Sequence, residues 1–145
     1  MNKINMSNEQ ALTKIMNWCS KMERSKFDVQ NKLYTWGVDK SKIDGIIERL
    51  EKEGFLSSNR FLEAFIKGKL YYNKWGRVKI KYHLKLKGFP ENLIYIQMIF
   101  EQLKKKNTSL NVDDDYVKKS KVIQFGASRG YETELALQCV DKFTK

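Results

Sequence analysis

A stretch near the middle of the sequence carries many positive charges and no negative one. No Asp or Glu occurs from Ala64 to Pro90, and we call these residues the acid-free segment. Its cations are Lys67, Lys69, Lys74, Arg77, Lys79, Lys81, Lys85 and Lys87, and aromatic residues such as Trp75 and Tyr82 lie between them. Cations on long stems neutralise phosphates, and aromatic faces stack on exposed bases. The segment therefore indicates contact with nucleic acid or another polyanion.

A plainer interpretation of the acid-free segment stays open. The aromatic residues would then fill a hydrophobic core, and the lysines would only keep the surface soluble. We expect this of most of the individual aromatic residues. For the segment as a whole we favour binding, because an ordinary exposed helix face mixes charges of both signs.

Four further observations complete the candidate binding set. Arg24 and Lys26 flank the first expected turn between helices, and Arg60 lies just before the acid-free segment. Trp75 is the candidate stacking ring. The stretch Lys74 to Arg77 also places Gly76 at an expected helix start, where backbone N–H groups attract anions.

Residue types that carry catalysis or bind metals are few and poorly spaced. His83 is the only histidine, and Cys19 and Cys139 lie far apart without a CxxC motif. No phosphate-binding loop, dinucleotide-binding glycine motif or nucleophile elbow is present. The run Asp113 to Asp115 is better explained as negative charge at a helix start. We therefore expect no catalytic residue, no metal and no cofactor.

Composition limits the class of protein. The 145 residues carry a net charge of +11 and are 41% hydrophobic, with eight Phe, seven Tyr and three Trp, which is enough for a folded core. The single proline, Pro90, argues against a sandwich or barrel with many tight turns. No run approaches the roughly 18 apolar residues of a membrane span, and no signal peptide is recognisable. We expect a cytoplasmic monomer without membrane contact.

The elements that position the cations depend on how Arg77 to Lys87 folds. Its apolar residues fall on every second position (Val78, Ile80, Tyr82, Leu84 and Leu86), which is typical of a half-buried strand. An internal repeat favours a helix instead. Three copies align on Gly37, Gly88 and Gly130, with Val29, Ile80 and Val122 eight residues earlier and Val38, Phe89 and Tyr131 directly after.

The repeat reads as a helix, a left-handed glycine stop, an apolar residue and a second helix. One fold unit has to explain every copy, so we predict that Arg77 to Lys87 is a helix. Ile80 and Leu84 then face inward, while Val78, Tyr82 and Leu86 form a second face that either packs or stays an exposed apolar strip. The third copy is weaker, because Gly126 replaces the leucine found at Leu33 and Leu84.

Other helix boundaries follow from capping patterns. Ser7 with Gln10 forms a capping box, Ser25 caps a second helix, and Asp39 or Ser41 starts a third. Ser57 or Ser58 caps a fourth, and Pro90 suits a first helical position. The polar run Lys104 to Asn111 has loop composition and separates this helix from the next one. The predicted fold class is all-α.

With this pattern in place, the chain resembles the RecX family over most of its length, from about Ala11 to Val140. The matching positions of the first stretch are Arg24, Ser25, Asp28, Gly37, Leu50, Gly54, Leu56, Arg60, Phe61 and Phe65. Gly76, Ile80, Leu84 and Gly88 match a second stretch. The family commonly has proline where Arg77 stands, and an acidic pair where Ser58 and Asn59 stand.

The resemblance implies a chain of elongated tandem three-helix repeats. It also implies a regulator of the RecA recombinase that binds the RecA–DNA filament and restrains its extension, ATPase and strand exchange without catalytic residues of its own. Such a role belongs to homologous recombination, DNA repair and the SOS response. The partners implied are the RecA filament and single- or double-stranded DNA.

We expect a flexible N-terminus at residues 1–7 and repeats at 8–56, 57–106 and 107–145. The third repeat is expected to be shortened, because the segment between Leu103 and Tyr116 is too short and polar for a full first helix. Two other functions stay open: a separate nucleic-acid-binding module, and an adaptor that uses Val78, Tyr82 and Leu86. Charge reversal at Arg77, Lys79 and Lys81 is predicted to weaken filament binding and leave helicity intact.

Overall fold

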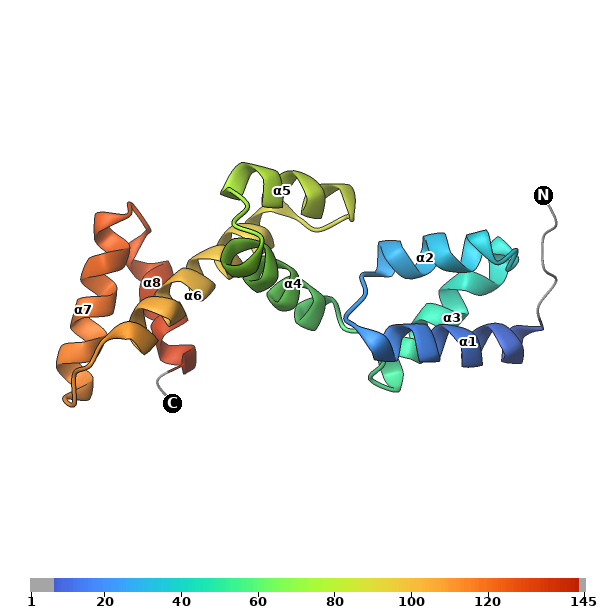
Figure 1. The fold of residues 1–145 in the computed structure, drawn as a ribbon, viewed down its shortest axis with the longest axis horizontal. Helices are drawn as coiled ribbons and strands as arrows, with labels where there is room; N and C mark the ends of the chain where they lie inside the picture. The colour runs from blue at the N-terminus through green and yellow to red at the C-terminus, as the bar shows by residue number, and fades with distance from the viewer. Residues whose placement is uncertain (1–6, 144–145) are drawn as a thin grey trace. The chain divides into compact units, whose positions relative to one another are not determined.

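The computed structural model describes residues 7–143 (Figure 1). Within this range the chain forms eight α-helices and one short π-helix, and no β-strand occurs among the described residues. The all-α prediction is confirmed. The predicted flexible N-terminus lies outside the described residues, except for Ser7.

The described residues divide into two compact units. Unit 1 contains the residues up to Phe65 together with Tyr82–Gly88, and unit 2 contains Ile66–Lys81 together with the residues from Phe89 onward. The division passes through two helices, so that each of them contributes residues to both units. The candidate binding residues are therefore described separately for the two units.

Unit 1 is built on three helices that pack against one another: α1 (Asn8–Lys21), α2 (Lys26–Thr35) and α3 (Lys40–Lys52) (Figure 1). Ile15, Val29, Leu33, Ile47 and Leu50 form the centre of their core. Most of α4 (Ser58–Lys67) and the C-terminal part of α5 (Arg77–Leu86) also belong to this unit.

The predicted caps of unit 1 are present. Ser7 and Gln10 form the capping box of α1, and Ser25 and Asp28 form that of α2. Asp39 is the cap of α3, and its carboxylate accepts a hydrogen bond from the Ser41 backbone N–H at 3.0 Å. Each cap satisfies backbone donors that a helix start leaves without a partner.

Unit 2 contains the π-helix η1 (Gly68–Tyr72), the start of α5, and three longer helices. These are α6 (Glu91–Ser109), α7 (Asp115–Ser128) and α8 (Thr133–Phe143), which pack against one another. Ile99, Leu103, Val122, Ala136 and Val140 lie in their shared core.

Gly126 explains why the third copy of the repeat looked weak. A Cβ atom at Gly126 would lie 3.3 Å from Leu103 Cδ2 and 3.6 Å from Ala136 Cβ. A leucine at this position would therefore collide with α6 and α8. The glycine lets α7 approach these helices closely, which is a packing role that the alignment on Gly130 does not reveal.

The helix prediction for Arg77 to Lys87 is confirmed through Leu86, where α5 ends. Ile80 and Leu84 are fully buried, whereas Val78, Tyr82 and Leu86 are 84%, 60% and 56% exposed. The glycine stops are confirmed as well. Gly37, Gly88 and Gly130 have φ values of 80°, 90° and 81°, in the left-handed region that favours glycine.

Two local predictions are wrong. Lys104 to Asn111 is not a loop, because α6 continues through Ser109 and only a short link precedes α7. The Thr108 hydroxyl donates to the Lys104 carbonyl oxygen at 3.0 Å, so a polar side chain is accommodated within the helix. Helix α6 packs with α7 and α8, so this group of three helices begins with a helix of 19 residues. Pro90 is the N-cap of α6 rather than its first residue.

The π-helix η1 was not predicted at all. The residue bounds proposed for the three repeats stay a prediction.

Candidate nucleic-acid interface

The link between η1 and α5 holds the centre of the acid-free segment. The Asn73 backbone N–H donates to the Gly68 carbonyl oxygen at 3.1 Å, and the Trp75 N–H donates to the Lys69 carbonyl oxygen at 2.8 Å. These two bonds tie the link back onto the π-helix. The cations on either side of the link are thereby held on a folded turn.

Lys74 has an unusual backbone conformation in this link. Its φ is 57°, and no other non-glycine residue among the described ones has a positive φ. The left-handed conformation costs an L-residue roughly 1–2 kcal/mol. Such strain persists where the surrounding structure imposes it, and it is often found at functional sites.

Trp75 follows Lys74 and is half-buried, with two ammonium groups close to its ring. Lys69 Nζ is 4.5 Å from the centroid of the ring, and Lys79 Nζ is 4.2 Å from it. Both distances are within the range of a cation–π interaction. The ring thus contacts one cation from η1 and one from α5.

Among the described residues, four candidate cations of unit 2 have no carboxylate within ion-pair distance. Within residues 7–143, Lys67, Lys74, Arg77 and Lys79 form no ion pair with a carboxylate, and all four are exposed. We call these four residues the unpaired basic group. The first turn of α5 contains no acidic residue, so its N-terminal dipole adds to their positive potential.

Other predicted binding residues are paired with carboxylates inside their own unit. In unit 2, Lys81 pairs with Glu91. In unit 1, Lys26 pairs with Glu51 at 3.4 Å, Arg60 with Glu23 at 3.1 Å, and Lys87 with Asp28 at 2.5 Å. Exposed pairs of this kind are weak and can open to a stronger ligand. The Lys87 pair is the most buried of them.

Arg24 and Lys85 have different surroundings in unit 1. The Arg24 guanidinium lies 3.9 Å from the Trp18 ring centroid, and its Nε donates to the Trp18 carbonyl oxygen at 3.4 Å. This stacking holds Arg24 at the α1 terminus. Lys85 is exposed on α5. The unit 2 group around Trp75 is therefore the strongest part of the predicted site.

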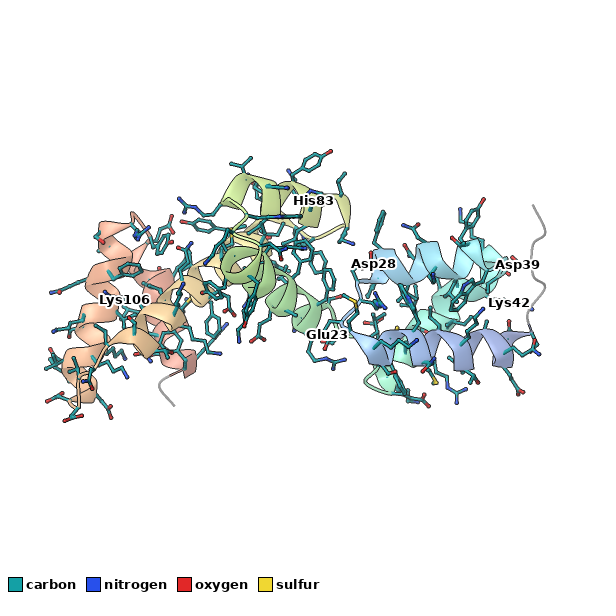
Figure 2. The ribbon with its side chains drawn as sticks, viewed as in Figure 1. Glu23, Asp28, Asp39, Lys42, His83 and Lys106 are labelled. Atoms are coloured by element: carbon teal, nitrogen blue, oxygen red, sulfur yellow. The ribbon has the colours of Figure 1, made fainter. Side chains whose placement is uncertain are left out.

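Sequence reasoning missed one basic cluster in unit 2. Lys105 and Lys106 on α6 lie near Arg129, the C-cap of α7, around a cleft. Lys106 is labelled in Figure 2. The signal was present as the run Lys104 to Lys106, but the assignment of this run to a loop hid its position beside aromatic rings.

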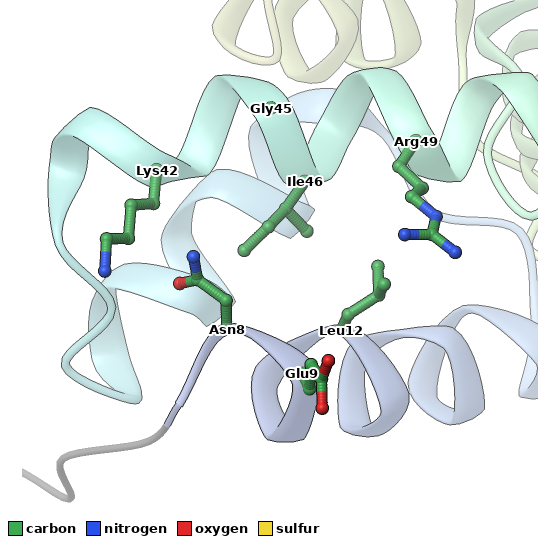
Figure 3. A pocket seen from close by; sticks show the side chains of 7 residues that line it. All are labelled: Asn8, Glu9, Leu12, Lys42, Gly45, Ile46 and Arg49. Atoms are coloured by element: carbon green, nitrogen blue, oxygen red, sulfur yellow. The ribbon is translucent and has the colours of Figure 1, made fainter.

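A further pocket in unit 1 has mixed charge. Figure 3 shows Leu12 on α1 and Ile46 on α3 pointing toward one another, with Lys42 and Arg49 on α3 and Glu9 on α1 around them. Arg49 Nε also lies 3.4 Å from Glu53 Oε1. Charges of both signs surround an apolar floor, so this pocket is a poor match for a polyanion.

Membrane-spanning helices and metal-binding groups are both absent from residues 7–143. No described helix is both long and apolar enough to cross a membrane. In the same range, no group of three or more His, Cys, Asp or Glu residues is placed to hold a metal ion.

Comparison with known families decides the relationship of the chain. Residues 59–95 match the model of RecX, second three-helix domain, and residues 94–140 match that of RecX, third three-helix domain. The chain belongs to the RecX family. The predicted resemblance is thus confirmed by models that together cover more than half of the sequence.

Individual RecX proteins match over most of this chain. Regulatory protein RecX of Clostridium beijerinckii is 32% identical over 135 residues, which cover 84% of this chain and 62% of the relative. Regulatory protein RecX of Chlorobium phaeobacteroides is 27% identical over 128 residues, which cover 83% of this chain and 84% of the relative. The chain spans about three fifths of the length of its Clostridium beijerinckii and Clostridium acetobutylicum relatives.

A solved RecX structure has the same fold. The crystal structure of RecX from Lactobacillus salivarius superposes with a TM-score of 0.54 at 16% identity, covering 94% of this chain and 96% of that one. The relatives are named as regulatory proteins.

Proposed function

We propose that this chain regulates a RecA recombinase filament on DNA by binding the filament through the unpaired basic group. Membership of the RecX family of regulatory proteins supports the regulatory part of the proposal. The single observation that supports the surface is that Lys67, Lys74, Arg77 and Lys79 have no carboxylate partner in the described part of the chain. A nucleoprotein filament offers the phosphates that these cations lack.

The physical basis is counterion release. Each cation that contacts a phosphate displaces a condensed ion from the nucleic acid, so binding weakens steeply as salt concentration rises. Trp75 holds Lys69 and Lys79 in place, which reduces the side-chain entropy lost on binding. Binding of the protein to the filament would by itself restrain filament extension, ATPase activity and strand exchange. The proposal requires no catalytic residue and no cofactor, and it places a monomer in the cytoplasm.

Co-sedimentation with preformed RecA filaments over a salt series tests the proposal. The variant Lys74→Glu/Arg77→Glu/Lys79→Glu replaces three members of the unpaired basic group. It improves on charge reversal at Lys81, because Lys81 already pairs with Glu91 and its reversal would set two carboxylates together.

A matched control replaces three exposed lysines outside the candidate sites, as Lys40→Glu/Lys121→Glu/Lys142→Glu. We expect the control to sediment with filaments like the unchanged protein, while the first variant stays in the supernatant. Equal binding of both variants would contradict the proposed surface. A binding curve that does not respond to salt would indicate protein contact alone.

One observation favours a second candidate function, that of a protein-binding adaptor. Val78, Tyr82 and Leu86 lie at four-residue steps on α5 and are all more than half exposed. An exposed apolar strip of this kind marks a protein contact in many folds. If the chain is an adaptor, the variant Val78→Ser/Tyr82→Gln/Leu86→Gln is expected to lose partner binding at every salt concentration.

A further inference from the structure

A second basic site in unit 2 is built on cations that the sequence did not suggest as binding residues. The C-terminal half of α6, the end of α7 and η1 line an open cleft with a volume of about 390 Å³. Lys105, Lys106 and Arg129 line it together with Tyr71 and Phe125. Of the described residues that line this cleft, none is Asp or Glu.

The three cations of the cleft lie over its aromatic rings. Lys105 Nζ is 4.5 Å from the Tyr71 ring centroid, and Lys106 Nζ is 5.3 Å from that of Phe125. The Arg129 guanidinium carbon is 4.9 Å from the same Phe125 ring. Within residues 7–143, none of the three forms an ion pair with a carboxylate.

A ring attracts a cation without accepting a conventional hydrogen bond from it. The quadrupole of the ring stabilises the charge, while the N–H donors of the ammonium or guanidinium stay available to oxygen acceptors. Cations held in this way are positioned before a ligand binds, and their N–H groups remain available as hydrogen-bond donors. Phosphate oxygens, which are strong acceptors with negative charge, are the natural complement.

Tyr71 is fixed as a neutral platform. Its hydroxyl donates to the Glu101 carbonyl oxygen at 2.6 Å, which anchors the ring of η1 to α6. Burial, together with the nearby charge of Glu101 and with Tyr131, raises the pKa of Tyr71 to about 12. The phenol therefore adds no negative charge to the cleft at neutral pH.

We propose that this cleft binds a backbone phosphate of single-stranded nucleic acid through Lys105, Lys106 and Arg129. The three cations surround a hollow, and a flexible single strand can turn one phosphate into a hollow more readily than a rigid duplex can. The contact requires no recombinase. The inference therefore goes beyond the proposed function and does not depend on it.

Fluorescence anisotropy of a labelled oligo-dT, without any recombinase, tests the site. The test variant is Lys105→Gln/Lys106→Gln/Arg129→Gln. The control, Lys40→Gln/Lys121→Gln/Lys142→Gln, removes the same charge from exposed positions outside the cleft. Each contact contributes about 0.7 to the slope of log K against log salt for a single strand. We expect the test variant to lose about 2 units of slope and about 100-fold in affinity at 0.1 M salt.

Three further arms identify the ligand and guard against misfolding. Circular dichroism and thermal unfolding must show the test variant folded like the control. If it is not, the single replacement Arg129→Gln, at an exposed cap, takes its place, with an expected loss of about fivefold. Binding of a labelled duplex is expected to depend less on the three cations. Inorganic phosphate at up to 50 times the oligonucleotide concentration is expected not to displace the oligo-dT.

The outcomes are separable from those of the filament test. Equal affinity and equal slope for test variant and control would overturn the cleft assignment, as would the absence of oligo-dT binding by the unchanged protein. Displacement of the oligonucleotide by inorganic phosphate would show a site for free phosphate and overturn the nucleic-acid assignment. The result of the RecA co-sedimentation is independent of all three outcomes, because that experiment varies Lys74, Arg77 and Lys79.

Discussion

Lys87 Nζ lies 2.5 Å from Asp28 Oδ1, although the two residues are 59 positions apart in the sequence. Their side chains are only 22% and 23% exposed. The ammonium also lies 5.8 Å from the Phe27 ring centroid and 5.6 Å from that of Phe61. This pair joins the C-terminal end of α5 to the start of α2 inside unit 1, so Lys87 is a structural residue there.

The first prediction concerns the energy of this pair. Asp28→Asn leaves the Lys87 ammonium partly buried without its counter-charge, while the amide oxygen can still cap α2. We expect a loss of about 1–2 kcal/mol in the free energy of unfolding. Urea denaturation of Asp28→Asn, Lys87→Met and the double variant measures the coupling. A coupling energy indistinguishable from zero would show that the pair contributes nothing.

The second prediction concerns acid stability. Burial raises the pKa of Asp28, but hydrogen bonds from Lys87 and from the Ser25 backbone and side chain outweigh it and hold the pKa below the usual 3.8. A carboxyl whose pKa is lower in the folded state than in the unfolded state stabilises the fold at every pH above its unfolded-state pKa. This contribution is lost as the pH falls through the folded-state pKa. The stability difference between the unchanged protein and Asp28→Asn should therefore be constant above about pH 5 and shrink below pH 4. A constant difference down to pH 2.5 would contradict the assignment.

Much of the fold was predictable because the local signals agree. Ser25 with Asp28, and the glycines Gly37 and Gly130, mark helix ends by capping and backbone conformation, which are properties of a few neighbouring residues. The alternation in Arg77 to Lys87 pointed to a strand, and the repeat on Gly88 corrected it. Periodicity alone would have predicted a strand in that stretch.

The candidate site was less predictable because ion pairing depends on distant residues. Nothing near Lys87 in the sequence indicates Asp28, and nothing near Arg60 indicates Glu23. The cleft of Lys105 and Lys106 was missed because Thr108 and Ser109 give their run the composition of a loop. Packing of Leu103 and Leu110 against the core favours helix there in spite of that composition.

The third prediction tests the glycine stop after α5. Gly88 has a φ of 90°, and a Cβ atom added there meets nothing within 4 Å. The cost of Gly88→Ala is therefore purely conformational, about 1 kcal/mol. Gly45→Ala inside α3 is the control, because its Cβ also meets nothing, its φ is not positive, and alanine is favoured in a helix interior. Equal urea midpoints for the two variants would show that the left-handed turn is not required.

The fourth prediction addresses the strain at Lys74. Glycine adopts a φ of 57° without steric cost, so Lys74→Gly should raise the free energy of unfolding by about 0.5–1 kcal/mol. The same change removes a cation of the unpaired basic group and should weaken filament binding by about fivefold at 0.1 M salt. Thermal unfolding and co-sedimentation measure the two effects. A variant that is both less stable and fully able to bind would contradict the functional interpretation of the strain.

The DNA-dependent ATPase of RecA tests the central claim most directly. It is measured against increasing concentrations of the unchanged protein, of Lys74→Glu/Arg77→Glu/Lys79→Glu, and of the control Lys40→Glu/Lys121→Glu/Lys142→Glu. The account predicts that the unchanged protein and the control inhibit alike, and that the test variant needs at least about tenfold more protein for half inhibition. Inhibition by the folded test variant at the same concentration as the control would contradict it.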